Sequence, residues 1–164
     1  MTSYLRLLLI CGVALSVVTC KDSSPTGPTT TPPTTNPGPT LPPNTGSVTV
    51  AINPNPVPFS GQPITDAGPG CKDVKNTWFY DHVFTESGGS EVTFTNRTDT
   101  FDGFVVNELT GLKIVVQANG TLTLHTRWCS GNPTEHTARS SFTGTDATGK
   151  IVTVTSPIVR LMKP

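Results

Sequence analysis

Residues 78–95, WFYDHVFTESGGSEVTFT, decide the fold of the chain. Trp78, Tyr80 and Phe84 fall on even positions of the first half, and valine and phenylalanine alternate with threonines after the glycines at 88–89. Apolar residues at every second position are typical of a strand with one buried face, and a glycine-rich break is typical of a turn. The stretch therefore predicts two half-buried β-strands separated by a turn.

Strand signals of the same kind continue on both sides of this stretch, and no segment after residue 47 shows sustained helical periodicity. The further strands that we expect begin at Val48, Phe104, Leu112, Leu122, Phe142 and Ile151. A succession of about seven to nine short strands, with turn residues between them and no helices, predicts an all-β, antiparallel sandwich over residues 47–164.

Two local signals refine the expected topology. Asn119-Gly120 lies between two of the strands, and because this pair tolerates the positive φ angles of a type I′ turn, it predicts a hairpin. The apolar positions change from even to odd across Pro157. A proline within a strand belongs at a bulge or a sheet edge, so residues 150–162 are predicted to form one bent edge strand that changes its partner or its sheet.

The N-terminus carries an export signal. Arg6 precedes an unbroken apolar run from Leu7 to Val18, and a charge followed by an apolar core of this length is typical of a secretory signal peptide. The run is too short to cross a bilayer, which takes roughly twenty residues. Residues 1–19 are therefore predicted to be a signal peptide.

The end of the run, Val17-Val18-Thr19-Cys20, resembles the lipobox of bacterial lipoproteins, although Thr19 stands where that family usually has glycine, alanine or serine. In that family the cysteine is lipidated and becomes the mature N-terminus. The resemblance implies that Cys20 anchors the chain to a membrane. Lys21, in place of an aspartate after the cysteine, implies the outer membrane in a host with two membranes. An ordinary cleaved signal near the same place is the alternative.

Residues 20–46 contain the predicted anchor site and a stalk. Between Ser23 and Gly46 the chain has eight prolines, eight threonines and almost no apolar side chain, so it cannot bury enough surface to offset its ordering entropy. Dense proline favours extended polyproline II at about 3.1 Å per residue, which lets the stalk hold a domain up to roughly 70 Å from its anchor. We expect a disordered Pro/Thr linker that acts as a spacer.

The cysteines indicate an oxidising compartment. One lies in the signal peptide and Cys20 is assigned to the lipid, which leaves Cys71 and Cys129 alone in the exported domain. These two are predicted to form a structural disulfide. The alternative is a metal site that combines Cys129 with His125 and His136, but this spacing matches no standard zinc pattern.

The composition limits the partners. The 164-residue chain is only 13% charged and has a formal net charge of zero, with an isoelectric point near 6.8. A nucleic-acid binder would show a basic patch or stripe, so we expect no nucleic-acid partner. The sequence also has no glycine-rich phosphate loop and no dinucleotide-binding fingerprint, so we expect no cofactor.

Candidate catalytic groups are few. The sequence has three histidines and no G-x-S-x-G nucleophile elbow. His82 shares a strand face with aromatic residues, which predicts a partly buried, hydrogen-bonded histidine, whereas His125 falls on the solvent face. Glu86 and Glu91 flank a glycine turn and are interpreted as exposed turn acids rather than as a catalytic carboxylate pair. The chain is therefore predicted not to be an enzyme and to hold no metal.

Two functions fit this organisation. The first is a non-enzymatic, lipid-anchored module of the cell envelope, a binding or structural domain for an unknown protein or glycan, with the loop at 62–74 as its best candidate surface. The second is a carbohydrate-binding domain in which exposed Trp78, Tyr80 or Trp128 stack on sugar rings. Strand alternation argues against the second function, because it places these aromatics in the core.

Several segments also resemble a known family. Uncharacterised bacterial lipoproteins with immunoglobulin-like domains are similar to residues 78–80, 84–89, 91–95, 127–129 and 142–150. The resemblance covers much of residues 71–156, and it implies an immunoglobulin-like sandwich without catalytic activity. An antibody-type domain would have its core tryptophan well after the first cysteine and a tyrosine two residues before the second, where this chain has Arg127, so the resemblance is to the broad class.

Overall fold

The computed structural model describes residues 41, 46–66 and 70–164. The predicted signal peptide, the predicted lipidation site at Cys20 and nearly all of the stalk lie outside these residues. The described part contains the strands β1 (Val48–Asn53), β2 (Asn76–Glu86), β3 (Val92–Phe101), β4 (Phe104–Leu109), β5 (Ile114–Val116), β6 (Thr121–Ser130), β7 (His136–Asp146), β8 (Ile151–Thr155) and β9 (Val159–Leu161). Among these residues no helix is long and apolar enough to span a membrane.

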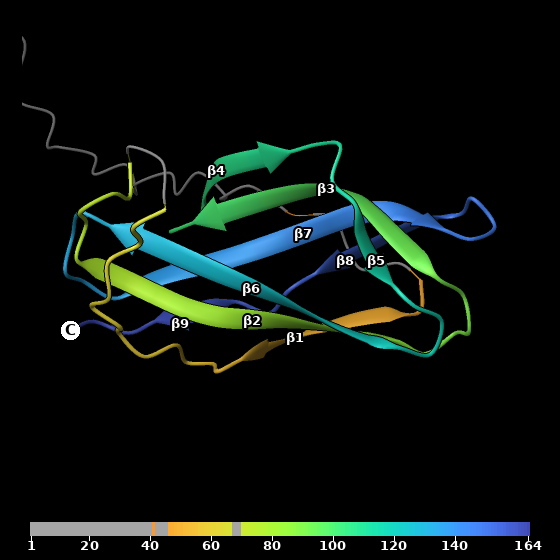
Figure 1. The fold of residues 1–164 in the computed structure, drawn as a ribbon, viewed down its shortest axis with the longest axis horizontal. Helices are drawn as coiled ribbons and strands as arrows, with labels where there is room; N and C mark the ends of the chain where they lie inside the picture. Colours follow the sequence, from red (N-terminus) through yellow and green to blue (C-terminus); the bar gives the residue numbers. More distant parts are fainter. Residues whose placement is uncertain (1–40, 42–45, 67–69) are drawn as a thin grey trace, which may run out of the picture. The chain divides into compact units, whose positions relative to one another are not determined.

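The strands form two antiparallel sheets that pack face to face (Figure 1). One sheet has the order β1-β2-β6, and the other has the order β4-β3-β7-β8, with β5 also paired to β3 and β9 also paired to β7. Trp78, Tyr80 and Phe84 are buried because even positions of β2 face the second sheet. The predicted all-β, antiparallel, immunoglobulin-like sandwich is confirmed.

One predicted hairpin is wrong. Asn119, with a φ of 53°, does turn the chain, but the turn leads from β5 in one sheet to β6 in the other. β5 pairs with β3 in one sheet, while β6 pairs along β2 in the other, so the two strands are not hairpin partners. A two-residue hairpin lies instead at Asp102-Gly103, where both residues have positive φ, as a type I′ turn requires.

The C-terminal segment also differs from expectation. Residues 150–162 form two short strands, β8 and β9, and both pair with β7, so the predicted change of partner is wrong. Pro157 lies in the break between them. Ser156 holds this break to β7, because its amide donates to the carbonyl of Ser140 at 2.8 Å and its hydroxyl accepts from the amide of Ser140 at 3.1 Å. The buried apolar positions change from even in β8 to odd in β9 within this break, and both strands stay in the same sheet.

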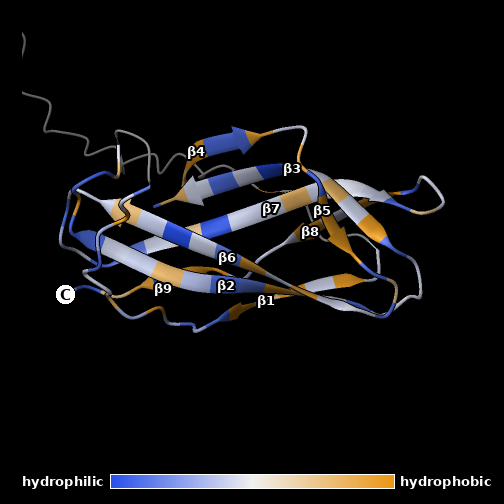
Figure 2. Cartoon of the chain, in the orientation of Figure 1, coloured by the Kyte–Doolittle hydropathy of each residue, from blue (hydrophilic) through white to orange (hydrophobic). Residues whose placement is uncertain are grey.

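Two apolar clusters fill the space between the sheets. The first is built around the rings of Phe84, Phe94 and Phe142, whose centroids lie 4.9 to 6.1 Å apart. The second contains Trp78 and Tyr80 with apolar residues of β7 and β9. In Figure 2 blue, hydrophilic segments cross β3, β6 and β7 between orange segments at either end of the sandwich.

A polar band separates the two clusters. Asp99 and Ser140 are paired neighbours on β3 and β7, and Asp99 accepts hydrogen bonds from the Nε of Arg97 at 2.7 Å and from the Ser140 hydroxyl at 2.6 Å. His82 of β2 is fully buried and its Nδ1 lies 2.9 Å from the Thr126 hydroxyl. The predicted hydrogen bond of His82 is confirmed, but its burial is complete rather than partial.

Candidate functional site

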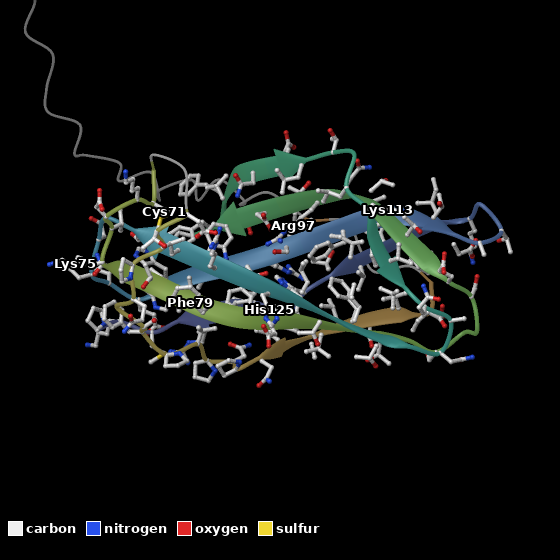
Figure 3. All side chains as sticks on the ribbon, in the orientation of Figure 1. Cys71, Lys75, Phe79, Arg97, Lys113 and His125 are labelled. Carbon is white, nitrogen blue, oxygen red and sulfur yellow. A yellow bond between two sulfur atoms is a disulfide. The ribbon has the colours of Figure 1, made fainter. Side chains whose placement is uncertain are left out.

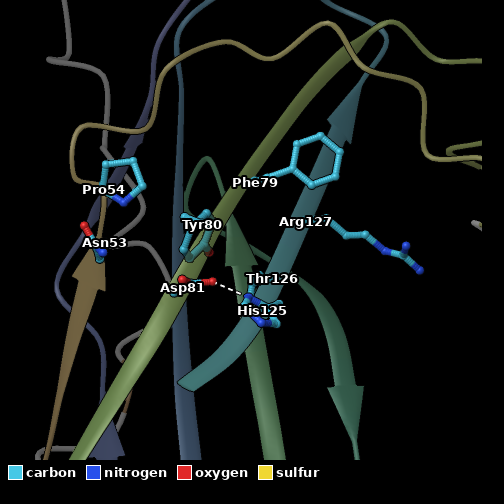
Figure 4. A pocket seen from close by; sticks show the side chains of 8 residues that line it. All are labelled: Asn53, Pro54, Phe79, Tyr80, Asp81, His125, Thr126 and Arg127. Carbon is cyan, nitrogen blue, oxygen red and sulfur yellow. Dashed lines mark hydrogen bonds and ion pairs between the residues drawn. The ribbon is translucent and has the colours of Figure 1, made fainter. Parts of the chain in front are cut away.

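The outer face of the sheet β1-β2-β6 is hollowed into a pocket of about 560 Å³ (Figure 4). The residues that line it are Asn53, Pro54, Phe79, Tyr80, Asp81, His125, Thr126 and Arg127. Phe79 pairs with Arg127 across the β2–β6 ladder. Asp81 pairs with His125 two positions further along, so strand register alone brings these side chains together. A concave surface with an aromatic group and a few convergent polar groups is the usual form of a ligand site.

A hydrogen-bonded histidine–aspartate pair and an arginine–aspartate ion pair shape this pocket. The Nδ1 of His125 lies 2.6 Å from the Oδ1 of Asp81, and the His125 side chain is 87% exposed, as its predicted place on the solvent face requires. Arg127 donates to the carboxylate of Asp66, and this hydrogen bond is the main reason why the pKa of Asp66 lies below its usual value. Each basic group is matched by a carboxylate, so the pocket offers hydrogen-bonding edges rather than a strong net charge.

Phe79 supplies the exposed aromatic surface of the pocket. It is 41% exposed, because its odd position on β2 directs the side chain away from the core. Figure 4 shows the ring and Arg127 toward one end of the pocket, with Asn53 and Pro54 across from them. Phe79 was not predicted as a site residue, although its odd position between Trp78 and Tyr80 indicates a ring on the outward face of the same strand.

Two of the three aromatic residues predicted to bind sugar are inside the protein. Trp78 is 0% exposed and Tyr80 is 3% exposed. Trp128 is half-buried, and its Nε1 donates to the Tyr80 hydroxyl at 2.9 Å. Burial raises the pKa of Tyr80 to about 12, against the opposing effect of this hydrogen bond. The prediction that Trp78 and Tyr80 form an exposed sugar-binding platform is therefore wrong. The alternative prediction from strand alternation, that these two rings lie in the core, is confirmed.

Glu86 is a buried structural acid and not an exposed turn residue. Its carboxylate accepts the amides of Gly88 at 2.7 Å, Gly89 at 2.9 Å and Asn119 at 2.8 Å, and also the Ser47 hydroxyl. The hydrogen bonds from Ser47 and Asn119 contribute most to lowering the pKa of Glu86 to about 2, and desolvation opposes them. Because its partners come from three segments, Glu86 ties the end of β2 to the turn before β6.

The other two histidines are also engaged within the fold. Burial, reinforced by the nearby Arg97, lowers the pKa of His82 to about 3, so this imidazole is neutral at physiological pH. The Nδ1 of His136 lies 2.7 Å from the Oδ2 of Asp102, and its ring packs edge-on against Trp78 with the centroids 5.5 Å apart. Neither group faces the pocket on the outer sheet face.

The predicted disulfide between Cys71 and Cys129 is confirmed, with the two Cα atoms 5.7 Å apart. It joins the loop before β2 to the end of β6. Because Cys129 is bound in this disulfide, the alternative metal site with His125 and His136 is wrong. The described parts of the chain also contain no group of three or more His, Cys, Asp or Glu residues that could hold a metal ion.

Comparison with known proteins shows similarity in fold only. No family model matches the chain, and no curated protein matches it significantly. The X-ray structure of Northeast Structural Genomics Consortium target SoR45 has a TM-score of 0.54 and 11% identity, covering 72% of this chain and 88% of that one.

Two further solved structures are more distant. The putative ApaA protein from Bordetella pertussis has a TM-score of 0.48 and 13% identity, over 71% of this chain and 94% of its own. The CARDB domain of the PF1109 protein from Pyrococcus furiosus, in complex with di-metal ions, has a TM-score of 0.42 and 12% identity, over 70% of this chain and 87% of its own. Neither says which ligand this chain binds.

Proposed function

We propose that this chain is a non-enzymatic module of the cell envelope that binds a protein or glycan in the pocket on the outer face of β1, β2 and β6. The observation that carries the proposal is the exposed ring of Phe79 beside Arg127 and Asp81 on paired strands. Strands hold these groups in fixed positions, so a ligand would bind without the entropic cost of ordering a loop.

A role without catalysis is supported by the state of the titratable groups. His82 is neutral in the core, Glu86 is enclosed by hydrogen bonds, and His136 is bound to Asp102. Two of the pocket residues carry a hydroxyl, and both hydroxyls are engaged within the fold: that of Tyr80 accepts from the Nε1 of Trp128, and that of Thr126 lies 2.9 Å from the Nδ1 of His82. An exposed nucleophile beside a base, which a hydrolase needs, is not part of this arrangement.

The place of the module in the cell follows from the N-terminal sequence. The lipobox-like end of the signal peptide supports lipidation at Cys20, and Lys21 supports the outer membrane as its destination. The Pro/Thr stalk would then hold the sandwich away from the lipid surface, within reach of ligands in the surrounding envelope.

The binding proposal is tested with the full chain in detergent and with isolated envelope proteins and glycans of the host as probes. Phe79→Ala removes the exposed ring and is expected to weaken binding at least tenfold. Ile151→Ala is the matched control, because Ile151 is also an exposed apolar residue, 65% accessible, but lies on β8 of the other sheet. Unchanged binding by the Phe79 variant would exclude this pocket as the site.

A carbohydrate is the second candidate ligand, favoured by the kinds of group that line the pocket. Phe79 offers a flat apolar face, and Arg127, Asp81 and Asn53 offer planar hydrogen-bonding groups around it. A glycan array probed with the wild type, Phe79→Trp and Phe79→Leu separates flat stacking from general apolar contact. A sugar ligand should keep its affinity with tryptophan and lose it with leucine, whereas equal binding by both variants would argue against stacking.

The anchor is tested independently of the ligand. The intact mass of the chain extracted from host membranes should correspond to a start at Cys20, increased by acyl groups and reduced by two hydrogens for the disulfide. Cys20→Ser should release the protein from the membrane fraction. An unacylated wild-type chain would make this a secreted module and would leave the pocket proposal untouched.

A further inference from the structure

A second hollow lies on the other side of β6, between the open edges of the two sheets. It measures about 490 Å³ and is lined by residues of β3, β4 and β6 and by Cys71 of the loop before β2. The strand residues on which the argument rests are Arg97, Asp99, Val106, Leu109, Arg127 and Trp128. We call this hollow the edge groove. Figure 3 shows Arg97 between β3 and β6, away from Phe79 on the outer sheet face. The two hollows share His125, Thr126 and Arg127 of β6 and differ in their other walls, since Phe79 lines only the outer-face pocket and Leu109 lines only the edge groove.

The edge groove arises because the two sheets are unequal in width. Within the described residues, β6 ends the sheet β1-β2-β6, while β4 ends the wider sheet β4-β3-β7-β8. The short strand β5 pairs with one half of β3 and contacts β6, which closes the sandwich there. β4 pairs with the other half of β3 and makes no comparable contact with β6. The narrower sheet thus lacks a strand opposite β4.

The strand that faces this opening is unusually exposed. All six residues of β4 are exposed, among them Phe104, Val106 and Leu109. Edge strands of soluble proteins are normally protected by lysines, prolines or covering segments, but β4 has only Glu108 as a charge and no proline. An apolar, uncovered edge of this kind indicates a surface that is covered in a complex.

The floor of the edge groove presents one donor and one acceptor. Arg97 donates its Nε to the Oδ1 of Asp99 and an Nη2 hydrogen toward Ser140 at 3.4 Å, which leaves Nη1 and the Oδ2 of Asp99 without a partner in the described structure. Among the side chains that the structure describes, only the Nε2 of His82 is both fully buried and unpartnered. Nη1 and Oδ2 therefore keep a small accessible area, with 13% of the Arg97 side chain and 3% of the Asp99 side chain exposed, and both residues line the edge groove.

The charges of the edge groove are balanced. Arg97 is matched by Asp99 and Arg127 by Asp66. A phosphate or another strong anion would be repelled by Asp99, whereas an uncharged carboxamide can donate to Oδ2 and accept from Nη1 at the same time. The complementary ligand is therefore neutral, and it carries an amide flanked by apolar groups.

We propose that the edge groove receives an extended peptide of a partner protein, which adds a strand to the open edge of β6. The main chain of this peptide would pair with β6 from Leu124 to Trp128, a length of about five residues at roughly 3.3 Å each. Its inward side chains would be a central asparagine or glutamine over Arg97 and Asp99 and flanking apolar residues against Val106 and Leu109. The protein's own stalk does not fit this description, because eight prolines deprive it of the amides that strand pairing needs.

The proposal is tested by selection from a displayed library of random heptapeptides on the full chain in detergent. Peptides that alternate apolar residues around a central carboxamide are expected to be enriched. They should bind Leu109→Lys at least tenfold more weakly and Phe79→Ala with unchanged affinity. A loss with Phe79→Ala and not with Leu109→Lys would assign the peptides to the outer-face pocket and overturn this proposal, whereas failure of glycan or protein binding in that pocket leaves the edge groove unaffected.

Hydrogen exchange of the complex identifies the edge that is paired. Bound peptide should slow exchange of the β6 amides between Leu124 and Trp128, and the circular dichroism spectrum of Leu109→Lys should match the wild type because Leu109 is exposed on an edge strand. Protection confined to β4, or a concentration-dependent dimer of the wild type that Leu109→Lys abolishes, would show that β4 or a second copy occupies this surface instead. The proposal would also be overturned if the library yielded no peptides that bind the wild type more tightly than the Leu109→Lys variant.

Discussion

The two ends of the sandwich bury their side chains in different ways. At one end, which we call the phenylalanine end, Phe84, Phe94 and Phe142 pack with valines from both sheets, and β5 lies beside β6. At the other, the tryptophan end, the rings of Trp78 and Tyr80 carry polar atoms that each have a partner. The first end is closed by strands, and the second is completed by loops, β9 and a disulfide.

The tryptophan end depends on contacts between distant parts of the chain. Trp78 donates its Nε1 to the carbonyl of Met162 at 2.8 Å and packs edge-on against Phe59, with the ring centroids 6.1 Å apart. Val57 forms a bridge to Leu161 in β9. Because loops and side chains replace paired strands here, β6 and β4 keep open edges, and both candidate ligand surfaces adjoin this part of the molecule.

The phenylalanine end contains the larger apolar cluster, whereas both candidate ligand surfaces adjoin the tryptophan end. Most polar groups near a core are satisfied by hydrogen bonds, which fix their positions, and the Nε2 of His82 is the exception among the described side chains. Arg97 and Asp99 belong to such a network, yet each keeps one atom at the solvent boundary.

The largest effect is expected from Gly144→Ala at the phenylalanine end. A Cβ on Gly144 would lie 2.0 Å from the carbonyl oxygen of Thr93 and 2.5 Å from the Cα of Phe94, both backbone atoms, at the bulge where β3 skips one residue against β7. We expect loss of folding, or destabilisation beyond about 4 kcal/mol, in urea unfolding. Gly131→Ala is the control, since its Cβ would meet nothing within 4 Å. Similar urea midpoints for the two variants would contradict the inference that the bulge requires a glycine at position 144.

Phe84→Ala should destabilise the protein by about 3–5 kcal/mol, because it removes a fully buried ring from the phenylalanine end and leaves a cavity. Phe104→Ala on β4, where the residue is 73% exposed, should change the free energy of unfolding by less than about 0.5 kcal/mol. Chemical denaturation of both variants measures the contrast. A large loss of stability from the Phe104 change would mean that β4 is part of the core and not an open edge.

Replacing Cys71 and Cys129 together by serine should destabilise the protein by about 2–4 kcal/mol, since the disulfide closes a loop with a sequence separation of 58. The amides whose hydrogen exchange becomes faster in the double-serine protein should be concentrated at the tryptophan end, where β6 ends at the disulfide. Hydrogen exchange of the oxidised and the double-serine protein makes this comparison. Uniform loosening of both ends would show that they unfold as a single unit.

The polar band should make stability depend on pH through His82. Its pKa is about 3 in the folded protein against an ordinary value of 6.5, so between these values the unfolded chain binds the additional proton. The contribution of the neutral His82 to the free energy of unfolding is fully present above pH 6.5. It is lost on acidification toward pH 3, by up to about 1.4 kcal/mol per pH unit for one proton. His82→Gln should flatten this slope in unfolding measured from pH 7 to pH 4. An unchanged slope would mean that the imidazole titrates freely in the folded state.

A smaller acid effect is expected from Glu86 at the phenylalanine end. Its folded pKa of about 2 is below the ordinary 4.5, so its contribution is present above pH 4.5 and is lost as the pH falls toward 2. Glu86→Gln should lower the melting temperature at pH 6 and remove the part of the pH dependence that lies below pH 4.5. Glu91→Gln, a change of an exposed acid beside the same turn, is the control and should leave both unchanged.

The main structural elements were predictable because their signals are local. Period-two alternation identified β1, β2 and β3, and it placed Trp78 and Tyr80 in the core. The disulfide followed from counting the cysteines of the exported domain. The glycine turn after β2 was likewise visible in three consecutive residues, since backbone freedom at a turn is a property of the residues that form it.

The remaining features needed the tertiary structure because they depend on residues far apart in the sequence. Asn119-Gly120 signals a turn, but whether the next strand pairs back or crosses to the other sheet depends on where β3 and β2 leave open edges. Glu86 looks like a solvated turn acid until Ser47 and Asn119 surround it. Alternation determines which side chains point inward, whereas the packing of the sheets determines which outward ones share a pocket and which edge stays open, and both candidate sites rest on those two outcomes.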